Sequence, residues 1–266
     1  MNMISNMEVQ DFVNARFGEA LAAKLGNIGR GAGNNKKGAD FEGYYATHTI
    51  VLIGASLAPA ECALHHVSCQ EAAFVDDLCV RDHGTGRKTN YQAKNSDGSA
   101  ADWTVDMQAR FEMQGIIDTD HHGAAEHEQV LVVSCETKAE ANKEKIPKSM
   151  RGYCRSEHFP YEQSSIELLM THQPLREAMS RLCASCSLAR LDEAFRIILG
   201  QWHADNCTGR TVLDVLTKAK ASARPDIFGG FTPLALATET GQRSRPDTPP
   251  QWLVDLLNRF QMGTVG

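Results

Sequence analysis

A continuous apolar run, "EQVLVVSCE" at 128–136, constrains the fold of this chain more than any other segment. The run has the length of a strand, and its residues do not alternate between apolar and polar. Strands without that alternation are buried on both faces, as in sheets that helices cover on either side. The run therefore predicts an α/β fold, in which a mixed sheet is flanked by helices.

Two further strands are predicted before this run. The segments "EAAFVDDLCVRD" (71–82) and "KTNYQAKN" (88–95) have the composition of strands. The loop "HGTGR" that joins them contains two glycines, so the two strands are expected to form an antiparallel hairpin.

Helical periodicity predicts the elements around these strands. Helices are expected over 11–25, 100–119 and 137–147, with a Gly/Asn-rich loop over 26–38. A further helix should begin near Ala39, although the β-branched "THTIVLI" leaves the structure of its second half open.

Beyond about Ser164 the chain contains only segments of helical periodicity, separated by Pro and Gly. We therefore expect a sheet-containing domain over 1–160 and a helical C-terminal region over 161–266 that serves partner binding or oligomerisation.

Composition excludes several classes of protein. With 266 residues and 42% hydrophobic content, the chain can bury a sizeable core. A net charge of -6 argues against non-specific coating of nucleic acid. The sequence contains no run of 18 or more apolar residues, so no membrane-spanning helix is predicted. The N-terminus lacks the shape of a signal peptide, so we expect a cytoplasmic protein whose eight cysteines are reduced.

The predicted hairpin brings together residues that suit phosphodiester chemistry. Strand alternation places Asp76 and Asp77 on opposite faces, and it places Gln92 and Lys94 on one face. One of the two acids can then meet Gln92 and Lys94. A carboxylate and an amide oxygen are hard ligands that suit Mg²⁺, and a nearby lysine can stabilise charge on a phosphate.

These residues resemble the motif of the PD-(D/E)XK nuclease superfamily, in the variant with Gln in place of the second acid. Mrr-like restriction enzymes and the double-strand DNA nuclease domains of bacterial anti-phage systems carry similar blocks. The resemblance covers about 38–136, through "GADFEGYYATHTIVL", "FVDDLCV" and "NYQAKNSDGSAADWT". It implies a restriction-endonuclease-like core, to which the helical C-terminal region predicted from periodicity is appended.

The resemblance also implies roles for individual residues. Glu42 would support the metal site, Asp77 and Gln92 would hold Mg²⁺ or Mn²⁺, and Lys94 would be the catalytic lysine, with Asp76 as the alternative to Asp77. The implied function is metal-dependent endonucleolytic cleavage of duplex DNA in anti-phage defence.

Partners and rival functions follow from the same resemblance. The chain has no nucleotide-binding loop, so a separate sensor or ATPase protein, or self-assembly into a homo-oligomer, would activate it. The alternatives are an inactive scaffold that binds DNA or proteins, and a nuclease that acts on RNA or single strands.

Several other residues are candidates for binding. Arg30, Lys36 and Lys37, with Arg87 and Lys88 in the hairpin loop, could contact a DNA backbone. The spacing of four further residues is compatible with Zn²⁺, although buried thiols are the simpler interpretation: Cys183, Cys186, His203 and Cys207. The histidine-rich stretch 118–128 is expected to be a polar surface loop.

Overall fold

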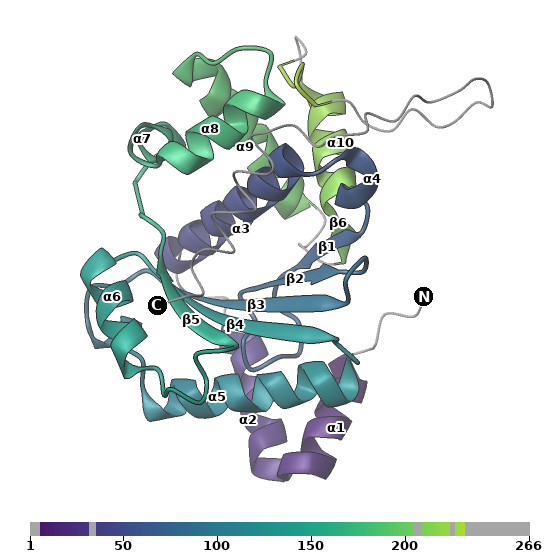
Figure 1. Ribbon diagram of the computed structural model, residues 1–266, viewed down its shortest axis with the longest axis vertical. Coiled ribbons are helices and arrows are strands. Elements are labelled where there is room, and N and C mark those ends of the chain that lie inside the picture. The colour runs from purple at the N-terminus through teal and green to yellow at the C-terminus, as the bar shows by residue number, and fades with distance from the viewer. Residues whose placement is uncertain (1–5, 32–35, 205–208, 224–226, 232–266) are drawn as a thin grey trace, which may run out of the picture. The chain divides into compact units, whose positions relative to one another are not determined.

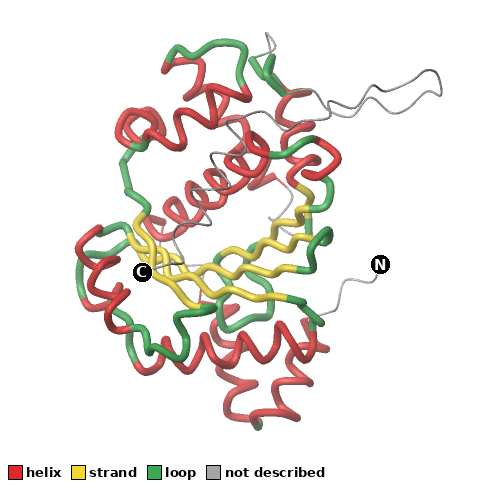
Figure 2. Tube along the Cα trace, viewed as in Figure 1, coloured by secondary structure: helices red, strands yellow, loops and turns green. Residues whose placement is uncertain are grey.

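The computed structural model describes residues 6–31, 36–204, 209–223 and 227–231. They form a six-stranded mixed sheet with helices on both faces (Figure 1). The predicted α/β class is therefore confirmed. Figure 2 shows the sheet in yellow between two layers of helices.

The strands are β1 (His65–Ser68), β2 (Leu78–Asp82), β3 (Arg87–Lys94), β4 (Glu126–Val133), β5 (Cys154–His158) and β6 (Arg210–Thr211). The helices that precede β4 are α1 (Asn6–Phe17), α2 (Glu19–Gly31), α3 (Lys36–Ser56), α4 (Pro59–Cys62), η2 (Ser99–Ala101), α5 (Val105–Ile116) and the π-helical turn η3 (Ile117–His121). The helices that follow β4 are α6 (Glu136–Lys145), α7 (Ser165–Thr171), α8 (Gln173–Leu182), α9 (Leu188–Ala204) and α10 (Val212–Ser222).

The strands lie in the order β5-β4-β3-β2-β1-β6. Strands β2 and β3 form the predicted antiparallel hairpin, with Leu78 opposite Tyr91. Strand β4 runs parallel to β3 and to β5, and the chain reaches it from β3 through α5. The sequence did not predict β1 or β5, because these strands are short and rich in polar residues, "HHVS" and "CRSEH".

Strand β4 is buried on both faces, as its apolar run predicts. Val130 and Val132 pack against the layer that contains α3, whereas Leu131 and Val133 pack against α5 and α6. Strand β3 differs, because only the face that carries Tyr91 and Ala93 packs in an apolar cluster. Its other side carries polar residues, and α5 buries them.

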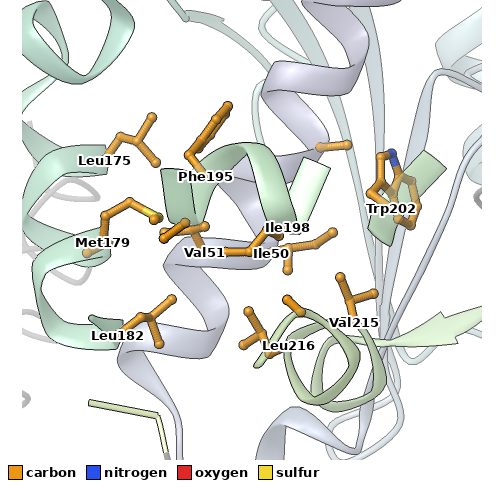
Figure 3. Packing of buried hydrophobic residues seen from close by; sticks show 14 of the residues in the cluster. Ile50, Val51, Leu175, Met179, Leu182, Phe195, Ile198, Trp202, Val215 and Leu216 are labelled. Atoms are coloured by element: carbon orange, nitrogen blue, oxygen red, sulfur yellow. The ribbon is translucent and has the colours of Figure 1, made fainter. Parts of the chain in front are cut away.

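Helix α3 packs between the sheet and the C-terminal helices. Figure 3 shows Ile50 and Val51 of α3 among apolar side chains of α8, α9 and α10, and all of these belong to one buried cluster. The apolar cluster therefore continues across the predicted boundary near residue 160. The described residues all belong to one compact unit.

Local differences from the predictions have identifiable causes. The helix predicted over 11–25 is interrupted at Gly18, where φ is +92°, a left-handed conformation that ends α1. Helix α2 continues to Gly31 and α3 already begins at Lys36, so most of the predicted loop over 26–38 is helical. The segment "THTIVLI" is helical as well.

Candidate active site

The acid pair lies at the entrance to β2 and not inside the strand. Strand β2 begins at Leu78, so Asp76 and Asp77 end the loop that connects it with β1. This loop turns back on itself at Gln70, whose φ is 54°. The backbone N–H of Gln70 donates to the backbone carbonyl of Asp76 at 2.7 Å. The prediction of a strand from residue 71 was therefore wrong.

The structure brings Asp77 to the end of β3. Its Oδ2 accepts hydrogen bonds from the Gln92 amide and from the backbone N–H of Ala93, the latter at 2.7 Å. Strand alternation predicted that one acid of the pair would meet Gln92, and the structure assigns that position to Asp77. Among the described residues, both hydrogen bonds to this carboxylate fall on Oδ2, which leaves Oδ1 for a further ligand.

Glu42 reaches the same place from α3. The pKa of Glu42 is raised to about 8, first by burial and then by the negative charge of Asp77, while the positive charge of Lys94 opposes the rise. Burial also raises the pKa of Asp77, against the opposing effect of Lys94. The three residues come from α3, from the loop before β2 and from β3, and they share one electrostatic environment.

Asp76 belongs to this group but lies deeper. It is 5% exposed, and Arg110 Nη2 lies 3.8 Å from its Oδ1. Its pKa is raised to about 7, first by burial and then by the negative charge of Asp77, while Arg110 and Lys94 oppose the rise. Asp76 is therefore a second carboxylate at the site and remains the alternative metal ligand.

Lys94 is half-buried among these carboxylates without contacting them. Within the described part of the chain, it forms no ion pair shorter than 4.0 Å with any acidic side chain. Its charge nevertheless acts on Glu42, Asp76 and Asp77. An ammonium group that is near three acids but paired with none is available to a ligand that enters between them.

Arg110 of α5 completes the site, and its position there was not predicted from the sequence. Its Nε and Nη2 donate to the Phe74 carbonyl at 2.8 and 2.5 Å, and Nη2 also donates to Gln92 Oε1 at 2.5 Å. The side-chain carbonyl oxygen of Gln92, which was predicted to bind the metal, thus already accepts a hydrogen bond from Arg110.

A sequence signal for Arg110 did exist. Arg110, Gln114 and Asp118 are spaced four residues apart, so they share one face of the helical segment that covers the sheet. A polar stripe on a face that should be apolar indicates a buried polar network.

The donor set suits a hard divalent cation. Carboxylates from Glu42, Asp76 and Asp77 lie in surroundings that raise their pKa, first of all because burial disfavours the charged form. No three His, Cys, Asp or Glu side chains of the described residues are arranged to hold a metal ion by themselves. Mg²⁺ does not need such a set, because it is commonly held by one or two carboxylates, several waters and a substrate phosphate.

The structure changes the interpretation of two predicted DNA contacts. Lys88 has no exposed area and forms an ion pair with buried Asp118 at 2.7 Å, so it cannot reach a nucleic-acid backbone. The assignment of Lys88 as a DNA contact was therefore wrong. Arg87 is half exposed but paired with Glu128 at 2.7 Å. The side chains of three other candidates lie outside the described residues: Arg30, Lys36 and Lys37.

The three described residues of the zinc-like spacing differ in their environments. Cys183 is buried in the apolar cluster around α3, whereas Cys186 is exposed. His203 lies on α9, where it packs against Gly43 of α3. Cys207 is outside the described residues. Cys183 thus has the environment of a structural thiol, and burial raises its pKa to about 12.

Comparison with known proteins returns no match. No protein-family model matches the chain, and no curated protein or solved structure is significantly similar to it. None of the described helices is long and apolar enough to cross a membrane.

Proposed function

We propose that the protein is a metal-dependent nuclease that hydrolyses phosphodiester bonds, with duplex DNA as its substrate. The observation that carries the proposal is the position of Lys94. Its ammonium group lies among Glu42, Asp76 and Asp77, which come from different segments, and it pairs with none of them in the described structure. Such an arrangement has room for a charged ligand that completes it.

The element order supports a restriction-endonuclease-like core. Helix α3 carries Glu42, the loop before β2 carries Asp77, and β3 carries Gln92 and Lys94. Helix α5 and strand β4 follow, and β4 lies parallel to β3. This order of elements along the chain is the one that the resemblance implies, and the agreement supports the proposal.

Each group has a chemical task in this proposal. Asp77, with Glu42 or Asp76, would hold Mg²⁺ or Mn²⁺ through carboxylate oxygens. A bound divalent cation polarises the phosphate and lowers the pKa of water. Lys94 is placed to stabilise the additional negative charge that develops on the phosphate oxygens. Hydrolysis adds one water oxygen to phosphorus and breaks one P–O ester bond, and the leaving oxygen takes up a proton.

The test is cleavage of supercoiled plasmid by the purified protein with Mg²⁺, with Mn²⁺ or with EDTA. We expect metal-dependent cutting that is lost in Asp77→Ala and Lys94→Ala, because each change removes a group at the reacting phosphate. Lys143→Ala is the matched control, since Lys143 is exposed and its ion pair in the described structure is with Glu140 of its own helix. Full cleavage by Lys94→Ala would contradict the proposal.

Two further measurements address the rival functions. Competition of the plasmid with RNA and with single-stranded DNA identifies the preferred nucleic acid. Absence of cutting with every substrate, while the duplex is still bound, would favour the inactive scaffold.

The resemblance also suggests a role in anti-phage defence with a separate sensor or ATPase partner, so the assay should be repeated with the products of neighbouring genes.

A further inference from the structure

Gln92 lies between two partners that together determine the orientation of its amide. Its Nε2 donates to Asp77 Oδ2, and its Oε1 accepts from Arg110 Nη2 at 2.5 Å. A guanidinium can only donate and an ionised carboxylate can only accept. The carbonyl of Gln92 therefore faces Arg110, and its NH₂ group faces Asp77. The side chain is 2% exposed, so water does not compete strongly for either bond.

This geometry explains why the residue is Gln and not Glu. A carboxylate at position 92 could accept the hydrogen bond from Arg110, but it has no proton to donate to Asp77. It would also place a second negative charge beside the Asp77 carboxylate, which is unfavourable for both. Gln has the required length and can accept on one side while it donates on the other.

Arg110 is itself held in place by α5 and by the loop that carries the acids. Arg110 donates two hydrogen bonds to the backbone carbonyl of Phe74. Gln114 Oε1 accepts a hydrogen bond from the backbone N–H of the same residue at 2.8 Å. Arg110 and Gln114 are four residues apart on α5, so one face of this helix binds both polar backbone groups of Phe74. Helix α5 thereby clamps the loop three residues before Asp77.

We infer that Gln92 and Arg110 form a positioning bridge that orients the Asp77 carboxylate, and that Gln92 is not a metal ligand. The bridge occupies Asp77 Oδ2 and leaves Oδ1 for the metal or for the water that it binds. This inference rests on the proposed nuclease function. It assigns a role to Arg110, and it replaces the role that the resemblance implies for Gln92.

The deciding variant is Gln92→Glu, which adds a better metal ligand but removes the donor to Asp77. We expect it to bind Mn²⁺ no more tightly than the unmodified protein and to lower kcat by about 100-fold, the cost of a misplaced reacting group. Calorimetry with Mn²⁺ alone measures the affinity, and plasmid cleavage measures kcat and KM. Gln108→Glu is the matched control, because Gln108 is only half-buried on α5 and its side chain donates to Glu112 of the same helix, away from Asp77.

Arg110 variants test the other half of the bridge. Arg110→Met should lower kcat by a similar factor with little change in KM, and Arg110→Lys should restore part of the loss because it keeps one charged donor. The double variant Gln92→Glu/Arg110→Met should be no slower than the worse single variant, since both changes break one unit. Thermal unfolding of each variant shows whether it is folded.

The outcomes separate this inference from the proposed function. Tighter Mn²⁺ binding with cleavage retained in Gln92→Glu would overturn the bridge and make residue 92 a ligand position. Unchanged affinity together with unchanged kcat in that variant would also overturn it. An unmodified protein that neither binds Mn²⁺ nor cleaves would overturn the nuclease function, and the positioning role with it.

Discussion

Two neighbouring basic residues of β3, Arg87 and Lys88, lie in very different environments. Alternation along the strand directs Lys88 towards the π-helical turn η3 that follows α5, where Asp118 Oδ1 lies 2.7 Å from its ammonium group and neither side chain is exposed to solvent beyond 1%. Asp118 also accepts hydrogen bonds from three buried amides, those of Asn90, Gln114 and Gln129. Arg87 lies on the opposite face, and its pair with Glu128 is half exposed.

Removal of the two cations should therefore have unequal effects. Lys88→Met leaves the buried Asp118 charge without its cation, so we expect the free energy of unfolding to fall by about 3–5 kcal/mol. Arg87→Met breaks a solvent-accessible pair and should cost less than about 1 kcal/mol. Urea unfolding of both variants measures the difference, and equal effects would show that the Lys88 network contributes little.

At the scale of elements, α3 depends on close approach to the C-terminal helices. A Cβ atom added at Gly54 would lie 2.2 Å from Leu216 Cδ1, and Leu216 of α10 is fully buried. The side chains around this contact are those of Figure 3, where Ile50 of α3 lies near Leu216. The absence of a side chain at Gly54 thus sets the distance between α3 and α10.

We expect Gly54→Ala to lower the free energy of unfolding by about 1–3 kcal/mol, because an overpacked core must shift its helices or side chains. Gly200→Ala is the matched control. Gly200 is exposed within α9 and has no atom within 4 Å of the added Cβ, so this change should raise stability by about 0.5–1 kcal/mol. Thermal unfolding compares the two, and a stabilising Gly54→Ala would contradict the proposed packing.

At the scale of the whole molecule, the sheet and the helices that follow it share one core. The apolar cluster that contains Phe41, Ile50 and Val51 of α3 also contains buried residues of α7, α8, α9 and α10. Helix α3 carries Glu42 near its start, so the C-terminal helices support the element that brings this acid to the site. A role for the region after residue 160 in partner binding or oligomerisation would be additional to this support.

Truncation tests whether one core or two exist. A chain that ends at residue 160 would expose one side of α3, so we expect it to lose cooperative thermal unfolding. A chain that ends at residue 232 keeps the whole compact unit and should unfold cooperatively. Cooperative unfolding of the shorter chain with native circular dichroism would instead support a domain boundary near residue 160.

Part of the candidate site could be predicted from local pattern. The period of two along a strand correctly indicated that Gln92 shares a face with Lys94 and that only one acid of the pair can meet Gln92. The residue at which β2 begins could not be predicted in this way. Arg110 and Gln114 take the backbone hydrogen bonds of Phe74 that a neighbouring strand would otherwise take. Side chains distant in sequence therefore decided that 71–77 is a loop.

The sequence by itself determined the α/β class, the β2–β3 hairpin and the burial of β4 on both faces, because hydrophobic periodicity is a local property of the chain. Only the tertiary structure decided which polar residues meet. Lys88 is buried opposite Asp118, and Gln92 bridges Arg110 and Asp77, because α5 lies against the polar face of β3. The environment of a polar side chain depends on what packs over it, and neither its own residue type nor its neighbours in sequence specify that.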